Sequence, residues 1–202
     1  GVIDYTFGGW AAPFGIAYHI DFANAYVLLI VTAISTVVSI FAKRSVASEI
    51  ETHSQGLFYT AWLLCLTGLL GITITGDAFN LFVFLEISSL SSYVLIAMGN
   101  DRKALTAAYQ YLIMGTIGAT FILIGIGLLY MLTGTLNMLD MAQRLIAVAD
   151  SRTARTGFAF LTVGLGLKIA LFPLHLWLPN AYAYAPSAVS AFLAATATKE
   201  AV

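Results

Sequence analysis

Charged residues are scarce in this chain. Only 9% of its 202 residues are Asp, Glu, Lys or Arg, whereas soluble domains carry roughly 25% charged residues. Hydrophobic residues make up 60% of the chain, and the formal net charge is -1. The few basic residues are scattered, so they form no basic surface for nucleic acid. The composition therefore argues against a soluble domain and against nucleic-acid binding, and it favours a protein embedded in the lipid bilayer.

Cysteine is nearly absent, and motifs for cofactor chemistry are missing. The single cysteine, Cys65, lies in an apolar run and can form neither an internal disulfide nor a cysteine-based metal site. The sequence contains no His-Glu-x-x-His zinc motif, no Gly-x-Ser-x-Gly elbow and no P-loop. We therefore expect neither a cofactor nor a metal site in this chain, and nothing supports a membrane-embedded enzyme.

Long apolar runs follow one another along the chain. A transmembrane helix needs about 20 mostly apolar residues to cross a hydrocarbon core of about 30 Å, and we expect about six such segments on that basis. They cover residues 24–42, 57–75, 78–98, 106–132, 157–172 and 186–202. Pro173 interrupts the fifth segment, and a proline inside a helix kinks or breaks it. The sequence predicts an all-α polytopic integral membrane protein with a broken helix near Pro173.

The parts outside these runs divide the chain further. Residues 1–23 are rich in glycine and aromatic residues and indicate a loop at the membrane interface, so that residues 24–202 form the membrane domain. The connection 133–156 has an apolar face, and it predicts a short surface helix. The chain opens without Met and stops inside an apolar segment, so we expect a fragment of a longer protein.

Small residues punctuate the third and fourth runs. Glycines 115, 118 and 125 lie in the fourth run, and serines 88, 89, 91 and 92 lie in the third. Such residues let helix backbones approach closely in a membrane. The pattern predicts a tightly packed helix bundle.

Glu86 lies near the middle of the third apolar run. A carboxyl group at the bilayer centre costs at least about 2.5 kcal/mol on insertion scales, so it normally faces the protein interior or water and serves a function. Ser89 and Tyr93 follow at i+3 and i+7 and therefore share its helix face. We predict that Glu86 takes part in ion translocation. The alternative is a structural ion pair that holds two helices together.

Lys168 is the second charge within an apolar run, and it lies five residues before Pro173. Broken helices at membrane depth are tolerated where they line a cavity or are buried in protein, and they recur at ion sites in transporters. A buried lysine also exchanges its proton readily. We predict a role in proton translocation, against the alternative that Lys168 extends to the interface.

Three further polar residues are weaker candidates. Lys199 lies in the sixth run, where it is either a functional charge or a charge at a helix end. His175 lies in a segment with three prolines, which we expect to exclude a regular helix, and it is either a proton relay or an interface residue. Asp77 precedes the third run and suits a helix cap.

Three segments together resemble a known family. They are Thr75-Gly-Asp-Ala-Phe-Asn-Leu-Phe-Val-Phe-Leu-Glu86, Gly-Leu-Lys168-Ile-Ala-Leu-Phe-Pro173-Leu-His175, and Ala-Pro186-Ser-Ala-Val-Ser-Ala with Lys199 beyond it. In this order they resemble the antiporter-like membrane subunits of respiratory complex I (NADH:quinone oxidoreductase) and of Mrp-type multisubunit Na+/H+ antiporters. Among these, the first segment looks most like the D-type branch of the Mrp antiporters.

This resemblance implies both a fold and a function. The fold would have about fourteen helices in two inverted repeats, of which this chain would hold the N-terminal half-channel, cut off at its C-terminal end. Glu86 would pair with Lys168, and Lys199 would carry the proton onward. The implied partners are other membrane subunits, the lipid bilayer, H+ and possibly Na+, in a bacterial or archaeal cell membrane. Within a complex I-like assembly this chain would carry no redox centre. The alternative is a membrane scaffold subunit of an oxidoreductase or hydrogenase complex that does not pump.

Overall fold

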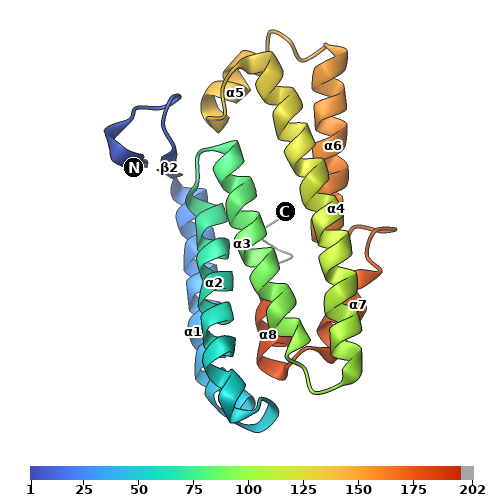
Figure 1. Cartoon of the computed structure of the whole chain (residues 1–202). Helices are drawn as coiled ribbons and strands as arrows, with labels where there is room; N and C mark the ends of the chain where they lie inside the picture. The colour runs from blue at the N-terminus through green and yellow to red at the C-terminus, as the bar shows by residue number, and fades with distance from the viewer. Residues whose placement is uncertain (197–202) are drawn as a thin grey trace.

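The structure is a computed structural model that describes residues 1–196. Its two strands and eight α-helices within those residues are β1 (Ile3–Thr6), β2 (Ala17–Ile20), α1 (Phe22–Glu49), α2 (Gln55–Ile74), α3 (Ala78–Ala97), α4 (Arg102–Thr133), α5 (Met138–Leu145), α6 (Arg152–Ile169), α7 (Trp177–Tyr184) and α8 (Ser187–Ala195). Helices α1, α2 and α3 stand side by side, and α4 and α6 form a second group beside them (Figure 1). The short α5 lies at one end of the bundle, and α7 and α8 lie in its other half.

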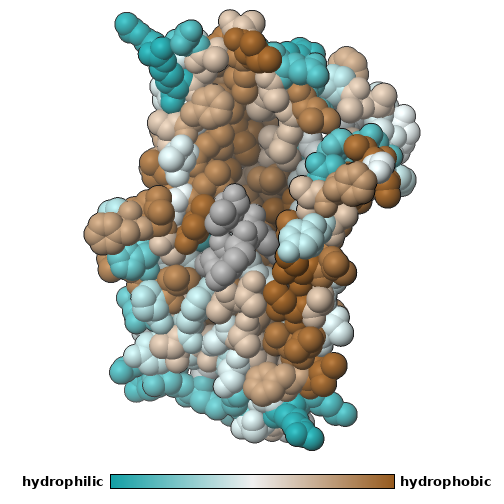
Figure 2. Space-filling model, turned by 180° about the vertical axis from the view of Figure 1, so that it is seen from behind, coloured by the Kyte–Doolittle hydropathy of each residue, from teal (hydrophilic) through white to brown (hydrophobic). Residues whose placement is uncertain are grey.

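Four helical stretches of residues 1–196 are long and apolar enough to cross a membrane. Three of them are α1, α3 and α4. The fourth is the stretch Thr52–Ile74, which contains α2. Figure 2 shows one face of the molecule, where hydrophilic residues gather at the two ends and hydrophobic residues cover much of the surface between them. This distribution fits a bilayer around the middle of the bundle. The predicted all-α polytopic membrane architecture is confirmed.

The fifth and sixth predicted runs correspond to α6 and α8, with a break between them. Helix α6 ends at Ile169, and Ala170 has φ 58 and ψ 43, which is the left-handed region. The predicted broken helix near Pro173 is confirmed, and the break begins at Ala170, close to Lys168. The expectation that the prolines exclude a regular helix is wrong for α7, because Pro179 lies within the first turn of that helix. Backbone N–H groups there have no intrahelical acceptor, so proline is tolerated.

The first 23 residues contain more order than the predicted loop. Strands β1 and β2 pair antiparallel, with Tyr5 opposite Tyr18. The backbone N–H of Gly76, between α2 and α3, donates to the Ala17 carbonyl of β2 at 2.9 Å. The backbone N–H of Met138, at the start of α5, donates to the Gly76 carbonyl oxygen at 2.9 Å. Three segments far apart in the chain are thus joined at one end of the bundle.

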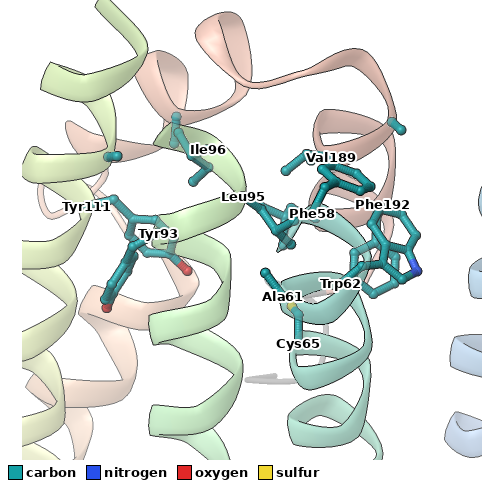
Figure 3. Packing of buried hydrophobic residues seen from close by; sticks show 14 of the residues in the cluster. Phe58, Ala61, Trp62, Cys65, Tyr93, Leu95, Ile96, Tyr111, Val189 and Phe192 are labelled. Carbon is teal, nitrogen blue, oxygen red and sulfur yellow. The ribbon is translucent and has the colours of Figure 1, made fainter. Parts of the chain in front are cut away.

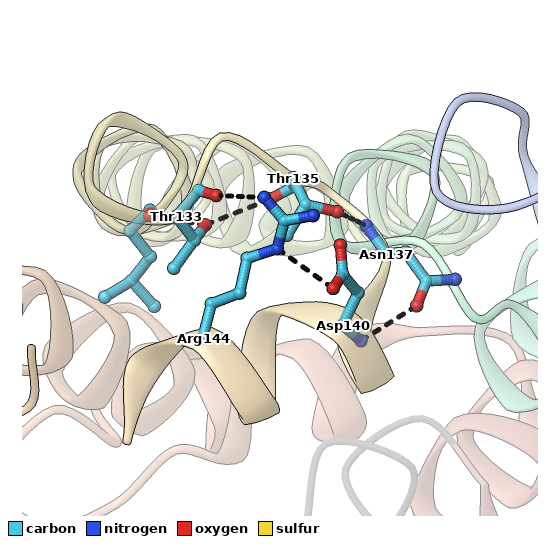
Figure 4. Close-up of polar contacts among 6 residues, drawn as sticks. Thr133, Thr135, Asn137, Asp140 and Arg144 are labelled. Atoms are coloured by element: carbon cyan, nitrogen blue, oxygen red, sulfur yellow. Dashed lines mark hydrogen bonds and ion pairs between the residues drawn. The ribbon is translucent and has the colours of Figure 1, made fainter. Parts of the chain in front are cut away.

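Helix α5 confirms the short helix predicted in the connection 133–156, and Arg144 ties it to the end of α4. The Arg144 guanidinium donates to the Thr133 carbonyl oxygen at 3.1 Å and to the Asp140 carboxylate at 2.9 Å (Figure 4). The hydrogen bond from Arg144 lowers the pKa of Asp140 below its ordinary value. Asn137 caps the helix by accepting from the Asp140 N–H.

Glycines set the contact between α4 and α6, as the pattern of small residues predicts. A Cβ added at Gly164 would lie 2.7 Å from the Gly118 carbonyl oxygen, and one added at Gly125 would lie 2.9 Å from the Gly157 carbonyl oxygen. The two backbones can approach this closely only because these side chains are missing. This contact places Lys168 of α6 against the bundle.

The larger cluster of buried hydrophobic residues contains side chains of α1, α2, α3, α4, α7 and α8, and Figure 3 shows part of it. Phe192 of α8 packs against Trp62 of α2, with ring centroids 4.4 Å apart, and Phe58 stacks on Trp62 with ring centroids 5.8 Å apart. The carboxylate of Glu49, at the end of α1, accepts from the Ser187 N–H at 2.8 Å and so caps the first turn of α8. Helix α8 is thereby held by α1 and α2 together.

Candidate functional site

The two intramembrane charges predicted from the sequence lie together in the structure. The Lys168 ammonium nitrogen of α6 is 3.6 Å from a carboxylate oxygen of Glu86 in α3. Lys168 is 7% exposed, and the Glu86 side chain is 25% exposed. The distance is that of an ion pair but exceeds the usual length of a hydrogen bond. The site is therefore a loose ion pair between two helices that are far apart in sequence.

Ser89 gives Lys168 its shortest contact. The Lys168 ammonium donates to the Ser89 hydroxyl oxygen at 2.6 Å. Ser89 lies one helical turn after Glu86, so both acceptors face the lysine from the same side of α3. The sequence pattern placed Ser89 beside Glu86 but gave no sign that it would bind Lys168.

The broken end of α6 forms the second half of the site. The Leu171 N–H donates to the Gly166 carbonyl at 2.8 Å, and the Ala170 N–H donates to the Leu167 carbonyl at 3.3 Å. These two hydrogen bonds form a Schellman motif, which ends a helix at a residue in the left-handed conformation. Lys168 lies in the last turn, where the negative end of the helix dipole stabilises a positive charge. The break thus supports a charged lysine at this depth.

Aromatic side chains pack together between α3, α4 and α7. The Tyr93 hydroxyl is buried against Gly115 of α4, where an added Cβ would collide with it. Tyr93 meets Tyr111 edge to face, and Tyr111 stacks on Trp177 of α7 with centroids 4.1 Å apart. Figure 3 shows Tyr93 and Tyr111 adjacent to each other between α3 and α4. Sequence reasoning did not identify this packing.

The remaining predicted residues lie away from the pair or beyond the described part. His175 lies between α6 and α7, where its ring packs on Phe172, and its buried Nδ1 has no hydrogen-bond partner among residues 1–196. Lys199 lies outside the described residues. Asp77 caps α3 by accepting from the Asn80 N–H, as predicted.

The site offers proton chemistry through Glu86, Lys168 and Ser89. Among residues 1–196, no three His, Cys, Asp or Glu side chains gather closely enough to hold a metal ion. A carboxylate, an amine and a hydroxyl in one buried group can hold a proton and pass it on when their spacing changes.

Comparison with known proteins gives the family. Residues 75–202 match the family described as NADH:quinone oxidoreductase/Mrp antiporter, TM. The chain belongs to this family of antiporter-like membrane subunits.

Two curated relatives represent the two kinds of complex in the family's description. The chain is 46% identical over 195 residues to the N-type subunit of NADH-quinone oxidoreductase from Desulforudis audaxviator, an alignment that covers 96% of this chain and 38% of the relative. It is 33% identical over 204 residues to the D-type subunit of the Na(+)/H(+) antiporter from Bacillus subtilis, covering 98% of this chain and 40% of the relative. The chain therefore spans about two fifths of the length of these relatives.

A solved structure confirms the fold, and this chain again covers about two fifths of the matched chain. A chain of the membrane-bound sulfane sulfur reductase, an archaeal respiratory membrane complex, superposes with a TM-score of 0.89 at 35% identity. The match covers 97% of this chain and 39% of that one. The helix bundle described above thus corresponds to about two fifths of that chain.

Proposed function

We propose that the protein translocates protons, alone or in exchange for Na+, as one subunit of a multisubunit membrane complex. The observation that carries this proposal is the ion pair of Lys168 and Glu86, with its 3.6 Å separation, beside a helix break. Family membership supports it, because the relatives are named as subunits of an Na+/H+ antiporter and of NADH-quinone oxidoreductase.

The mechanism is electrostatic. Two unit charges about 4 Å apart attract each other by about 4 kcal/mol at an effective dielectric constant of about 20, and about 1.4 kcal/mol corresponds to one pH unit of proton affinity. A movement that separates Glu86 from Lys168 therefore changes how tightly the lysine holds its proton. The break after Ile169 is the place where such a movement can occur with little disturbance of the rest of α6.

Other parts of the chain have roles in the same proposal. Residues 24–202 form the N-terminal half-channel, residues 1–23 lie at the membrane interface, and Lys199 and His175 pass the proton onward. The Nδ1 of His175 supports this last role, because it is a buried ring nitrogen with no hydrogen-bond partner among residues 1–196. The complex lies in the cell membrane, with other membrane subunits as partners.

The test is proton flux in inverted vesicles that contain the full-length protein in its complex. Wild type and Glu86→Gln are compared, once with a sodium gradient and once with an electron donor as the driving force, and assembly is measured in both. We expect the flux to fall at least tenfold in Glu86→Gln while the complex stays assembled. The driving force that works in wild type separates an antiporter from a redox-driven pump.

A second candidate function is a scaffold that does not pump. The observation in its favour is that the Lys168 contacts tie α6 to α3, as a purely structural pair would. A scaffold predicts that Glu86→Gln lowers the amount of assembled complex and leaves the flux per assembled complex unchanged. That result would replace the first proposal.

A further inference from the structure

Helix α3 carries four buried serines, and one of them differs from the others. The hydroxyls of Ser88, Ser91 and Ser92 donate to carbonyl oxygens of their own helix, those of Leu85, Ile87 and Ser88, at 2.7 to 3.0 Å. Such bonds to the preceding turn are the common behaviour of serine within helices. Ser89 instead accepts a hydrogen bond from Lys168, a residue 79 positions later in the chain. Ser89 is 4% exposed, so water does not compete freely for this contact.

The lysine therefore has two partners of different chemistry. The neutral hydroxyl of Ser89 lies 2.6 Å from the ammonium, and the carboxylate of Glu86 lies 3.6 Å from it. A carboxylate can only accept hydrogen bonds, and most of its attraction for the lysine is lost when the ammonium gives up its charge. A hydroxyl can accept from an ammonium and can also donate to a neutral amine. Ser89 can thus remain a partner of Lys168 in both protonation states.

We propose that Ser89 is a positioning residue that holds the Lys168 nitrogen when its pair with Glu86 is loosened and while the lysine gains or loses its proton. This proposal rests on the proposed function and adds a component to it. The hydrogen bond to Ser89 is stronger while the lysine is charged, but it persists in weaker form when the lysine is neutral. Ser89 therefore keeps the lysine nitrogen in place after its charge has gone.

Ser89 is the uncharged hydrogen-bond partner of Lys168. Among residues 1–196, the titratable side chain that acts on Lys168 is Glu86, and Tyr93 lies near both Glu86 and Ser89. Tyr111 of α4 lies next to Tyr93, with Cys65 of α2 and Tyr182 of α7 near it. The ordinary pKa values of phenols lie near 10, so these tyrosines carry no charge in the physiological range. The Tyr93 hydroxyl is buried against Gly115 rather than bonded to the ammonium.

The test is the pH profile of proton flux in vesicles that contain the full-length protein in its complex, with Ser89→Ala. Hydrogen bonds to a charged group are about twice as strong as neutral ones, so the variant loses more in the protonated state. We expect the profile to move to lower pH by about 0.5 to 1 unit and the maximal flux to fall by roughly three- to tenfold. Ser91→Ala is the matched control, since that hydroxyl bonds only to its own helix at 2.7 Å, and its profile should match wild type.

Two further variants make the result decisive. Ser89→Cys keeps nearly the same volume with a weaker acceptor, so it should shift the profile less than Ser89→Ala; it also serves if the alanine variant does not assemble. Glu86→Gln is measured in the same vesicles. If Glu86→Gln abolishes flux while Ser89→Ala and Ser89→Cys keep the wild-type profile, the role of Ser89 is wrong and the proposed function stands. If Glu86→Gln leaves flux intact, the proposed function itself fails.

Discussion

The indole N–H of Trp177 donates a hydrogen bond to the carbonyl oxygen of Leu167 at 3.0 Å, across the break between α6 and α7. The break leaves carbonyl groups at the end of α6 without the partners that a continuing helix would supply. The Trp177 indole supplies a hydrogen-bond donor to one of these carbonyl groups, and its ring is fixed by stacking on Tyr111. Because Leu167 directly precedes Lys168, the anchoring of α7 and the position of the lysine are linked.

Trp177→Phe separates the hydrogen bond from the stacking. The phenyl ring can still pack on Tyr111, but the Leu167 carbonyl loses its indole donor and keeps only the 3.3 Å hydrogen bond from the Ala170 N–H. We therefore expect a loss of about 0.5–1.5 kcal/mol in stability. Trp177→Leu also loses the ring stack and should lose about a further 1 kcal/mol. The measurement is the unfolding midpoint of the purified protein in detergent. A midpoint for Trp177→Phe equal to that of wild type would contradict the anchoring role.

Ala170 offers a test of the break itself. A left-handed backbone costs a residue with a Cβ roughly 1–2 kcal/mol, and glycine avoids this cost. Ala170→Gly should therefore stabilise the protein by up to about 1 kcal/mol with transport retained, because glycine also loses more backbone entropy on folding. Ala170→Val should destabilise it, since β-branched residues tolerate this conformation worst. The reverse order of unfolding midpoints would show that α6 does not end at this residue.

Gly115→Ala tests the packing behind the ion pair. The new methyl group would collide with the Tyr93 hydroxyl, so either the Tyr93 ring or the spacing of α3 and α4 would have to change, at a cost of about 1–3 kcal/mol. Gly127→Ala on the same helix is the control, because no atom lies within 4 Å of its added Cβ. Adding Tyr93→Phe to Gly115→Ala should restore part of the loss in assembled complex. Equal assembly of the two alanine variants would contradict the close approach at Gly115.

Glu49 is predicted to hold the start of α8. Its carboxylate accepts from the Ser45 hydroxyl at 2.6 Å and from the Ser187 N–H at 2.8 Å. Glu49→Gln keeps the shape but removes the negative charge at a helix N-terminus, so we expect a loss of about 0.5–1 kcal/mol. Glu51→Gln, at a well-exposed position beside His53, should change nothing measurable. Limited proteolysis between α7 and α8 reports the difference, and equal cleavage of both variants would refute the contact.

Much of the site could be predicted from the sequence because charge is costly in a bilayer. Glu86 and Lys168 stand out within apolar runs, and the structure places them 3.6 Å apart. Pro173 also indicated a broken helix. The break lies earlier, at Ala170, because the left-handed turn there depends on hydrogen bonds and on the Trp177 contact, none of which has a sequence signal.

Contacts between distant segments were beyond sequence reasoning. The four serines of α3 look alike in the sequence, and only the packing of α6 selects Ser89 as the partner of Lys168. Likewise, the pairing of β2 with the segment around Gly76 joins parts of the chain that carry no common pattern. The helix through Pro179 was missed because a proline in a first turn is compatible with a helix start.

The most direct test of the account is a double-mutant cycle on proton flux with Glu86→Gln, Lys168→Met and both changes together in the full-length protein. If the two residues work as one pair, each single change should lower flux at least tenfold, and the double variant should lose no more than the worse single one. Multiplying losses would show that the residues act independently. Wild-type flux in either single variant would contradict the central claim.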